Sequence, residues 1–341
     1  VGAPRVETNL SVASYTIRGT GGRIEGTAEL RESTMEGATL AEGTRAEFRV
    51  EPRAISYSAQ GQVADLDLER VGRASAIAAL AKPEYASRVN GEFDVSGSLP
   101  RRQPGRREGA STLAEMTLVA AGRLKDSEIM GGRLPDLGFE THLTNGALNV
   151  RVDGSFENFD PARIAAQPRL EGNVSGAVTA TLMIVDLTSP ITPERIAADG
   201  QVALVKSTVA KLDIDNATID AEYVNGIANV RTFTLHGPDL DAEIAGTLAT
   251  GQTGTSNLQY RVNAVNIPGL ARLAGQEGIG GSATLEGTVT GDRVAATVTG
   301  TLKGSNLSYN EHNALDLTST YTITIPDLDA ARARVDATTE A

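Results

Sequence analysis

The stretch "VAATVTGTLKG" (Val294–Gly304) alternates two sets of side chains along its whole length. The apolar set consists of Val294, Ala296, Val298, Gly300 and Leu302, and the other set is mostly threonine. Successive side chains of a β-strand point to opposite faces of a sheet, so a period of two indicates a half-buried strand. Parallel sheets covered by helices have continuous apolar strands instead. The stretch therefore predicts an antiparallel sheet with one face in water.

Two further stretches have the same period. In "LDAEIAGTLAT", Ile244 and Leu248 share one face, and in "SATLEGTVTG" the same holds for Leu285 and Val289. Glycine falls on the apolar face of all three stretches, within the recurring phrase "GT". Glycine inside a strand commonly marks a bend, a bulge or a close approach of another group. Two interpretations stay open, namely curvature of the sheet and room for a ligand on a concave face.

Short helices are expected between the strands. In "ENFDPARIAAQP", Asp160 is a suitable N-cap, Pro161 occupies the first helical position and Pro168 ends the run. A second N-cap candidate is Thr192 in "ITPERIAADG". The pattern predicts short helices near residues 68–81, 160–166 and 268–274.

The transition from strand to short helix recurs at Leu66, Phe159, Ile267 and Leu328. In the first three copies a new glycine-rich strand follows the helix. Because the spacings are unequal, the pattern predicts a degenerate repeat rather than a strict solenoid. We expect one elongated β domain over residues 1–341, with approximate repeat units 55–155, 156–257 and 258–341.

Composition limits the possible functions. The net charge of −12 argues against nucleic-acid binding, which needs clustered Lys and Arg. The one basic cluster, "RRQPGRR" (Arg101–Arg107), is interpreted as a solvated loop or as a contact for an anion or a headgroup. The absence of cysteine removes disulfides, Cys–zinc sites and thiol chemistry. No run of about 18 apolar residues is present to span a membrane.

No catalytic constellation is visible in the sequence. His142, His236 and His312 lie far apart, without the spacing of metal ligands. Four acidic pairs, at Asp65/Asp67, Asp213/Asp215, Asp239/Asp241 and Asp327/Asp329, are interpreted as acids on the wet face of strands, with help in holding calcium as the alternative. "GIGGSA" has glycines after a helix and before a strand, the reverse of a dinucleotide site. We therefore expect no catalytic residue, no metal, no cofactor and no enzyme activity.

Three stretches resemble the AsmA-like and TamB-type envelope proteins of diderm bacteria. They are "DLDLERVGRASAIAALAKPEYASRVNGEFDVSGSL", "PDLDAEIAGTLAT" and "NIPGLARLAGQEGIGGSATLEGTVTG". In that family a short helix leads into strands with recurring glycine, as it does here. The resemblance covers most of residues 55–341. It implies an all-β fold with short helices, in which an elongated antiparallel sheet folds into an open groove called a β-taco.

The resemblance also implies a function in the periplasm. The apolar groove would shield the acyl chains of phospholipids during lipid transport or outer-membrane biogenesis. The chain begins without Met or a signal-peptide pattern and is expected to be an internal fragment of a longer protein. Segments outside the fragment would anchor it to the inner membrane and connect it to the outer membrane. The candidate lipid-contacting residues are Ile244, Leu248, Leu285, Val289, Val294, Val298 and Leu302.

Two other functions stay open. The first is a structural or adhesive β-solenoid of a secreted surface protein, which would have a filled core. The second is an assembly factor that templates the strands of outer-membrane β-barrels through an open sheet edge, with outer-membrane assembly proteins as partners. In a closed sandwich or a solenoid the same apolar residues would be ordinary core.

Overall fold

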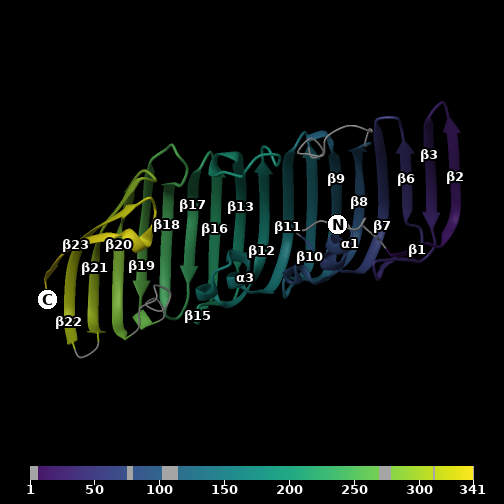
Figure 1. The fold of residues 1–341 in the computed structure, drawn as a ribbon. Helices are drawn as coiled ribbons and strands as arrows, with labels where there is room; N and C mark the ends of the chain where they lie inside the picture. Colours follow the sequence, from purple (N-terminus) through teal and green to yellow (C-terminus); the bar gives the residue numbers. More distant parts are fainter. Residues whose placement is uncertain (1–6, 75–79, 102–113, 269–277, 310–311, 341) are drawn as a thin grey trace. The chain divides into compact units, whose positions relative to one another are not determined.

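The computed structural model describes residues 7–74, 80–101, 114–268, 278–309 and 312–340 (Figure 1). The chain forms two compact units. Unit 1 comprises Val1–Asn158 and Thr181–Ile191, and unit 2 comprises Phe159–Ala180 and Thr192–Ala341. Both units consist mainly of antiparallel β-strands with a few short helices, so the expected all-β class is confirmed. The prediction of a single repeat domain with three units stays a prediction.

In unit 1 the main sheet has the order β2–β3–β6–β7–β8–β9–β10–β11. Beside it, β1, β4 and β5 pair in sequence and join β7. The strand bounds are β1 Thr8–Asn9, β2 Val12–Thr20, β3 Arg23–Leu30, β4 Ser33–Met35, β5 Ala38–Leu40, β6 Arg45–Val50, β7 Ala54–Leu66, β8 Ser87–Pro100, β9 Thr117–Ile129, β10 Gly132–Thr144 and β11 Ala147–Phe159.

In unit 2 the order is β13–β16–β17–β18–β19–β20–β21–β22–β23, and β14 pairs with both β12 and β15. The residues of β12 after Ala180 belong to unit 1. The bounds are β12 Gly172–Ile184, β13 Ile196–Leu204, β14 Ser207–Val209, β15 Leu212–Ile214, β16 Asn216–Val224, β17 Ile227–His236, β18 Leu240–Ala249, β19 Ser256–Ala264, β20 Ile279–Gly291, β21 Ala295–Tyr309, β22 His312–Pro326 and β23 Arg334–Glu340. Among the described residues of either unit, no ladder joins the first strand to the last, so each sheet is open.

The helices are short and lie between strands (Figure 1). They are α1 Leu68–Ala74 and α3 Pro161–Ala165, with 3-10 turns η1 Pro83–Tyr85, η2 Pro168–Leu170, η3 Pro193–Arg195 and η4 Ala330–Arg332. No helix in the described part of the chain is both long and apolar enough to cross a bilayer.

The helix expected at 160–166 is confirmed. Asp160 accepts a hydrogen bond from the Ala162 N–H at 3.0 Å, and Ala166 ends the helix in the left-handed conformation. The helix expected at 68–81 is present as far as Ala74, and residues 75–79 lie outside the described residues, as do 269–274 of the third expected helix.

Thr192 is the N-cap residue of η3, with Pro193 in the first turn as expected. Its side chain makes no capping hydrogen bond, however, and η3 is a single 3-10 turn rather than a helix. The chain enters β13 at Ile196, immediately after this turn, so no room is left for a helix.

A buried serine marks three hairpins. Ser33, Ser127 and Ser207 are 3%, 0% and 5% exposed. Each accepts a backbone N–H from a preceding segment, from Ser11 at 3.0 Å, from Asn90 at 2.9 Å and from Ser175 at 3.1 Å. Three and four residues after each serine, both turn residues have positive φ, and the seventh residue is a buried Leu40, Leu134 or Ile214. The same hairpin therefore occurs twice in unit 1 and once in unit 2.

The well-buried apolar core is small. In unit 2 it gathers near one end of the strands, where Leu212, Leu240 and Ala264 pack with Leu235, Val262 and Ile267. Several large apolar side chains of each unit stay exposed, among them Tyr15 and Ile17 in unit 1 and Leu315 and Val335 in unit 2.

Candidate functional site: the apolar sheet faces

The pairing register of unit 2 collects the apolar side chains on one face of its sheet. The central cross-strand row runs Phe233, Ile244, Tyr260, Gly287, Gly300 and Tyr321. Two residues away on either side lie the rows Val262, Leu285, Leu302 and Leu258, Val289, Val298, Ile323. We call these three rows the apolar face of unit 2. Because side chains alternate, Arg261, Glu286 and Thr301 lie on the opposite, polar face.

Six of the seven residues proposed from the sequence share this face. Ile244, Leu285, Val289, Val298 and Leu302 lie in the three rows, and Leu248 lies on the same side of β18, two residues beyond Gly246. Val294 does not belong to the set. It precedes β21 and is 65% exposed, because the Asp292 carboxylate accepts the Val294 N–H at 2.9 Å and holds a turn there.

The apolar face of unit 2 is only partly buried. Its residues Ile244, Leu285, Val289, Val298 and Leu302 all keep part of their surface accessible to solvent. Within the described residues, the extensive close contacts between strands join hydrogen-bonded neighbours. A closed sandwich would bury these positions within a core about 10 Å thick.

Unit 1 has an equivalent face. Its central row runs Ile17, Gly26, Phe48, Tyr57, Gly97, Leu118 and Leu143. Towards β2 the large side chains are strongly exposed, with Tyr15 at 72%, Ile17 at 61% and Phe48 at 41%. Contiguous exposed apolar surface of this kind usually marks a place where another molecule binds.

Aromatic rings lie over the glycines of both faces. A Cβ built on Gly26 would meet the Phe48 ring, and a Cβ on Gly97 would meet the Tyr57 hydroxyl at 2.9 Å. The same relation joins Phe139 with Gly122, Tyr260 with Gly287 and Tyr321 with Gly300. An aromatic side chain covering a cross-strand glycine is a known stabilising pair in sheets. At each of these glycines a Cβ would meet both an aromatic side chain and a backbone carbonyl oxygen of the neighbouring strand.

These ring–glycine pairs were not identified from the sequence. Each glycine and each aromatic residue is visible there, and all have the apolar phase of the alternation. Pairing them requires the register between strands that are up to 61 residues apart, as for Tyr260 and Tyr321. The tyrosine hydroxyls are affected by this packing, since partial burial raises the pKa of Tyr57 and, together with the hydrogen bond to Tyr321, that of Tyr260.

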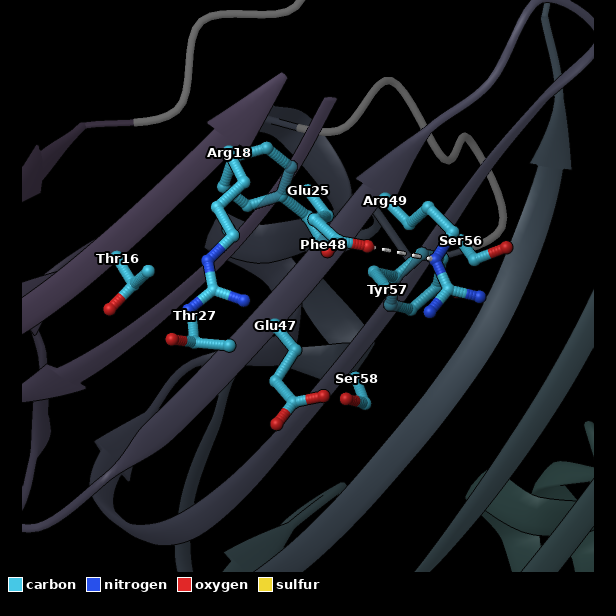
Figure 2. A pocket seen from close by; sticks show the side chains of 11 residues that line it. Thr16, Arg18, Glu25, Thr27, Glu47, Phe48, Arg49, Ser56, Tyr57 and Ser58 are labelled. Carbon is cyan, nitrogen blue, oxygen red and sulfur yellow. Dashed lines mark ion pairs between the residues drawn. The ribbon is translucent and has the colours of Figure 1, made fainter. Parts of the chain in front are cut away.

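The polar faces are held by ion pairs between neighbouring strands. Figure 2 shows a hollow in unit 1 lined mainly by polar side chains of β2, β3, β6 and β7, among them Arg18, Glu25, Glu47 and Arg49. Glu25 pairs with Arg49 of the neighbouring strand β6 at 3.8 Å and with Arg23 of its own strand at 2.7 Å, and both, Arg23 most strongly, lower the pKa of its carboxyl. These pairs are exposed to water and stabilise the fold only weakly.

Two of the four acidic pairs of the sequence have a structural role. Asp65 and Asp327 are left-handed corner residues, with φ of 57° and 54°. The partner carboxylates accept backbone N–H groups of the following turn, at Glu69 for Asp67 and at Ala331 for Asp329. These two pairs therefore do not put two acids on one strand face. The described residues contain no group of three or more potential metal ligands.

The three histidines are not brought together. His142 lies on the polar face of unit 1, opposite Val119 and Asn149. In unit 2, His236 Nδ1 lies 2.9 Å from the Asp241 carboxylate, and His312 begins β22.

No family model, curated protein sequence or solved structure matches the chain. Its function must therefore be inferred from its residues and their geometry.

Proposed function

We propose that the apolar faces of the two units bind the acyl chains of lipids. In this proposal the chain is part of an envelope protein of a diderm bacterium that transports phospholipid or supports outer-membrane biogenesis in the periplasm. The observation that carries the proposal is the apolar face of unit 2, whose side chains share one side of the sheet and stay only partly buried. The sequence resemblance to AsmA-like and TamB-type proteins supports the same interpretation.

Acyl chains suit this surface chemically. Each methylene removed from water contributes about 0.8 kcal/mol, and the contribution is not directional. A long flexible chain therefore gains affinity from a broad apolar surface without the enclosed pocket that a small rigid ligand needs. Rings that lie along the sheet over glycines project little from it, so they leave the apolar surface smooth enough for a long chain to lie on.

Of the two other functions considered above, the β-solenoid fits the described structure less well than lipid binding, and strand templating fits it equally well. A β-solenoid is built from parallel coils around a filled core, whereas every described ladder here is antiparallel. Strand templating is favoured by one observation, that β2 pairs only with β3 among the described residues and is exposed throughout. We retain templating as the second candidate function.

A photocrosslinking experiment tests the lipid proposal. Val298 is on the apolar face and its neighbour Thr299 is on the polar face of the same strand, so the two positions form a matched pair. A photoreactive residue at Val298 should give phospholipid adducts in the envelope, and one at Thr299 should not. Equal labelling, no lipid at either position, or protein adducts alone at Val298 would contradict lipid binding. Adducts of β-barrel precursors to photoreactive residues in β2 would favour templating.

A further inference from the structure

Two tyrosines meet across four strands in the middle of the apolar face of unit 2. Tyr260 on β19 and Tyr321 on β22 flank Gly287 and Gly300 in one cross-strand row. Three steps of about 4.8 Å place their Cα atoms roughly 14 Å apart, yet their hydroxyl oxygens are 2.6 Å apart. Both side chains must therefore lie along the sheet, over the two glycines. A Cβ on Gly287 would come within 2.5 Å of the Tyr260 hydroxyl.

The hydroxyl pair has one hydrogen-bond donor left over. Two phenols carry two O–H donors, and their mutual hydrogen bond uses one of them. Among the described residues neither hydroxyl has a further protein partner. The pKa of Tyr260 is raised above its ordinary value by partial burial and by the hydrogen bond to Tyr321, so the Tyr260 hydroxyl stays protonated near neutral pH.

Most of the neighbours of this donor on the same face are apolar. On one side lie Leu285 and Leu302, with Ser319 opposite Leu302 on β22, and on the other lie Val289 and Val298. The Ser319 hydroxyl already donates to the Thr338 carbonyl oxygen at 3.2 Å and accepts from the Thr339 hydroxyl at 3.1 Å. A polar group that loses water in such surroundings needs a hydrogen-bonding partner, because leaving it unpaired costs free energy. A lipid on this face would remove the water that now reaches the hydroxyls, so the lipid itself must supply an acceptor at this point.

We propose that the Tyr260–Tyr321 pair is a hydrogen-bonding site for the acyl carbonyl oxygen of a bound lipid. The lipid's hydrocarbon chain then lies over the flanking leucine and valine rows. The inference rests on the proposed function and makes it more specific, since it assigns a point of selection to a surface that is otherwise non-directional. Lipids with an ester or carboxyl carbonyl are preferred over lipids that lack one.

Ester- and ether-linked lipids provide the test. The purified full-length protein is loaded with a mixture of dipalmitoyl and dihexadecyl phosphatidylglycerol, which differ only in the carbonyl groups, and bound lipid is measured by mass spectrometry. The wild type should retain the ester lipid about fivefold better, the effect of one net hydrogen bond. In the double variant Tyr260→Phe/Tyr321→Phe, the ratio of bound ester lipid to bound ether lipid should fall to one. The total amount of bound lipid should not change, because both rings remain.

Single variants and a control sharpen the result. Tyr260→Phe or Tyr321→Phe alone leaves one free hydroxyl and should keep the preference. Tyr309→Phe, at an exposed position at the end of β21, should change nothing. Competition with palmitate identifies the source of the carbonyl group. If the tyrosine substitutions weaken the binding of palmitate but not that of the ester lipid, the natural ligand is a free fatty acid. Equal binding of ester and ether lipid by the wild type overturns the inference, whereas no binding of any lipid overturns the proposed function.

Discussion

At the scale of single residues, the atoms that lie over the glycines of the apolar faces decide whether a side chain could replace each glycine. Gly287 faces the Tyr260 hydroxyl and the backbone of β21, so a methyl group has no space there. Gly19 on β2 is also a strand glycine, but the nearest atom to its Cβ position is the Arg23 carbonyl oxygen at 3.8 Å.

Gly287→Ala should therefore lower the free energy of unfolding by about 1–3 kcal/mol, the usual effect of overpacking. Gly19→Ala should be neutral or slightly stabilising, because alanine restricts the unfolded chain. Equilibrium denaturation in urea measures both. Equal effects of the two substitutions would show that the covering ring is not the cause.

The sequence indicates the face of these residues but not their partners. Alternation places Ile244, Leu285 and Val298 on the apolar side because the period of two is local. It also wrongly extends to Val294, since the turn held by Asp292 interrupts the strand one residue before β21. The Tyr260–Tyr321 pair depends on three ladders between distant segments, and no local pattern contains that information.

At the scale of elements, hairpins are repeated with a common serine. The sequences "LRESTMEGATL", "LKDSEIMGGRL" and "LVKSTVAKLDI" share a leucine three residues before the serine and an apolar residue seven after it. The three stretches agree at only two or three positions. The strand–helix transitions are therefore easier to recognise as a repeat in the sequence. Asp160 could be identified as a cap because its proline neighbours are a strong local signal.

Ser127 offers a test of this element. Its hydroxyl accepts the Asn90 N–H at 2.9 Å and donates to the Asn90 carbonyl oxygen at 3.0 Å, where β8 and β9 lose their regular register. Ser127→Ala leaves a buried N–H without a partner and should cost about 1–3 kcal/mol of stability. Ser56→Ala, at an exposed site on β7, is the matched control. Thermal unfolding should separate the two variants, and similar melting temperatures would contradict a structural role for the serine.

At the scale of the whole molecule, the fold class followed from the alternation because every long strand has one apolar and one polar face. The division into two units did not follow, since both contain the same kinds of strand and turn. In each unit, apolar side chains stay partly or strongly exposed. That property distinguishes a surface that binds lipid from a core that only stabilises the protein, and the two respond differently to a charge.

Val298→Glu separates these cases. In a filled core an unpaired carboxylate would cost several kcal/mol and unfold the protein. On the partly exposed face of unit 2 the carboxylate can reach water, so the far-ultraviolet circular dichroism spectrum and the melting temperature should stay close to those of the wild type. Acyl chains should then be excluded from unit 2, while the apolar face of unit 1 still binds them. Native mass spectrometry should show lipid reduced but not abolished, with Thr299→Glu as the control that keeps the full load. Global unfolding of Val298→Glu would identify the face as core, and an unchanged lipid load would place lipid elsewhere on the protein.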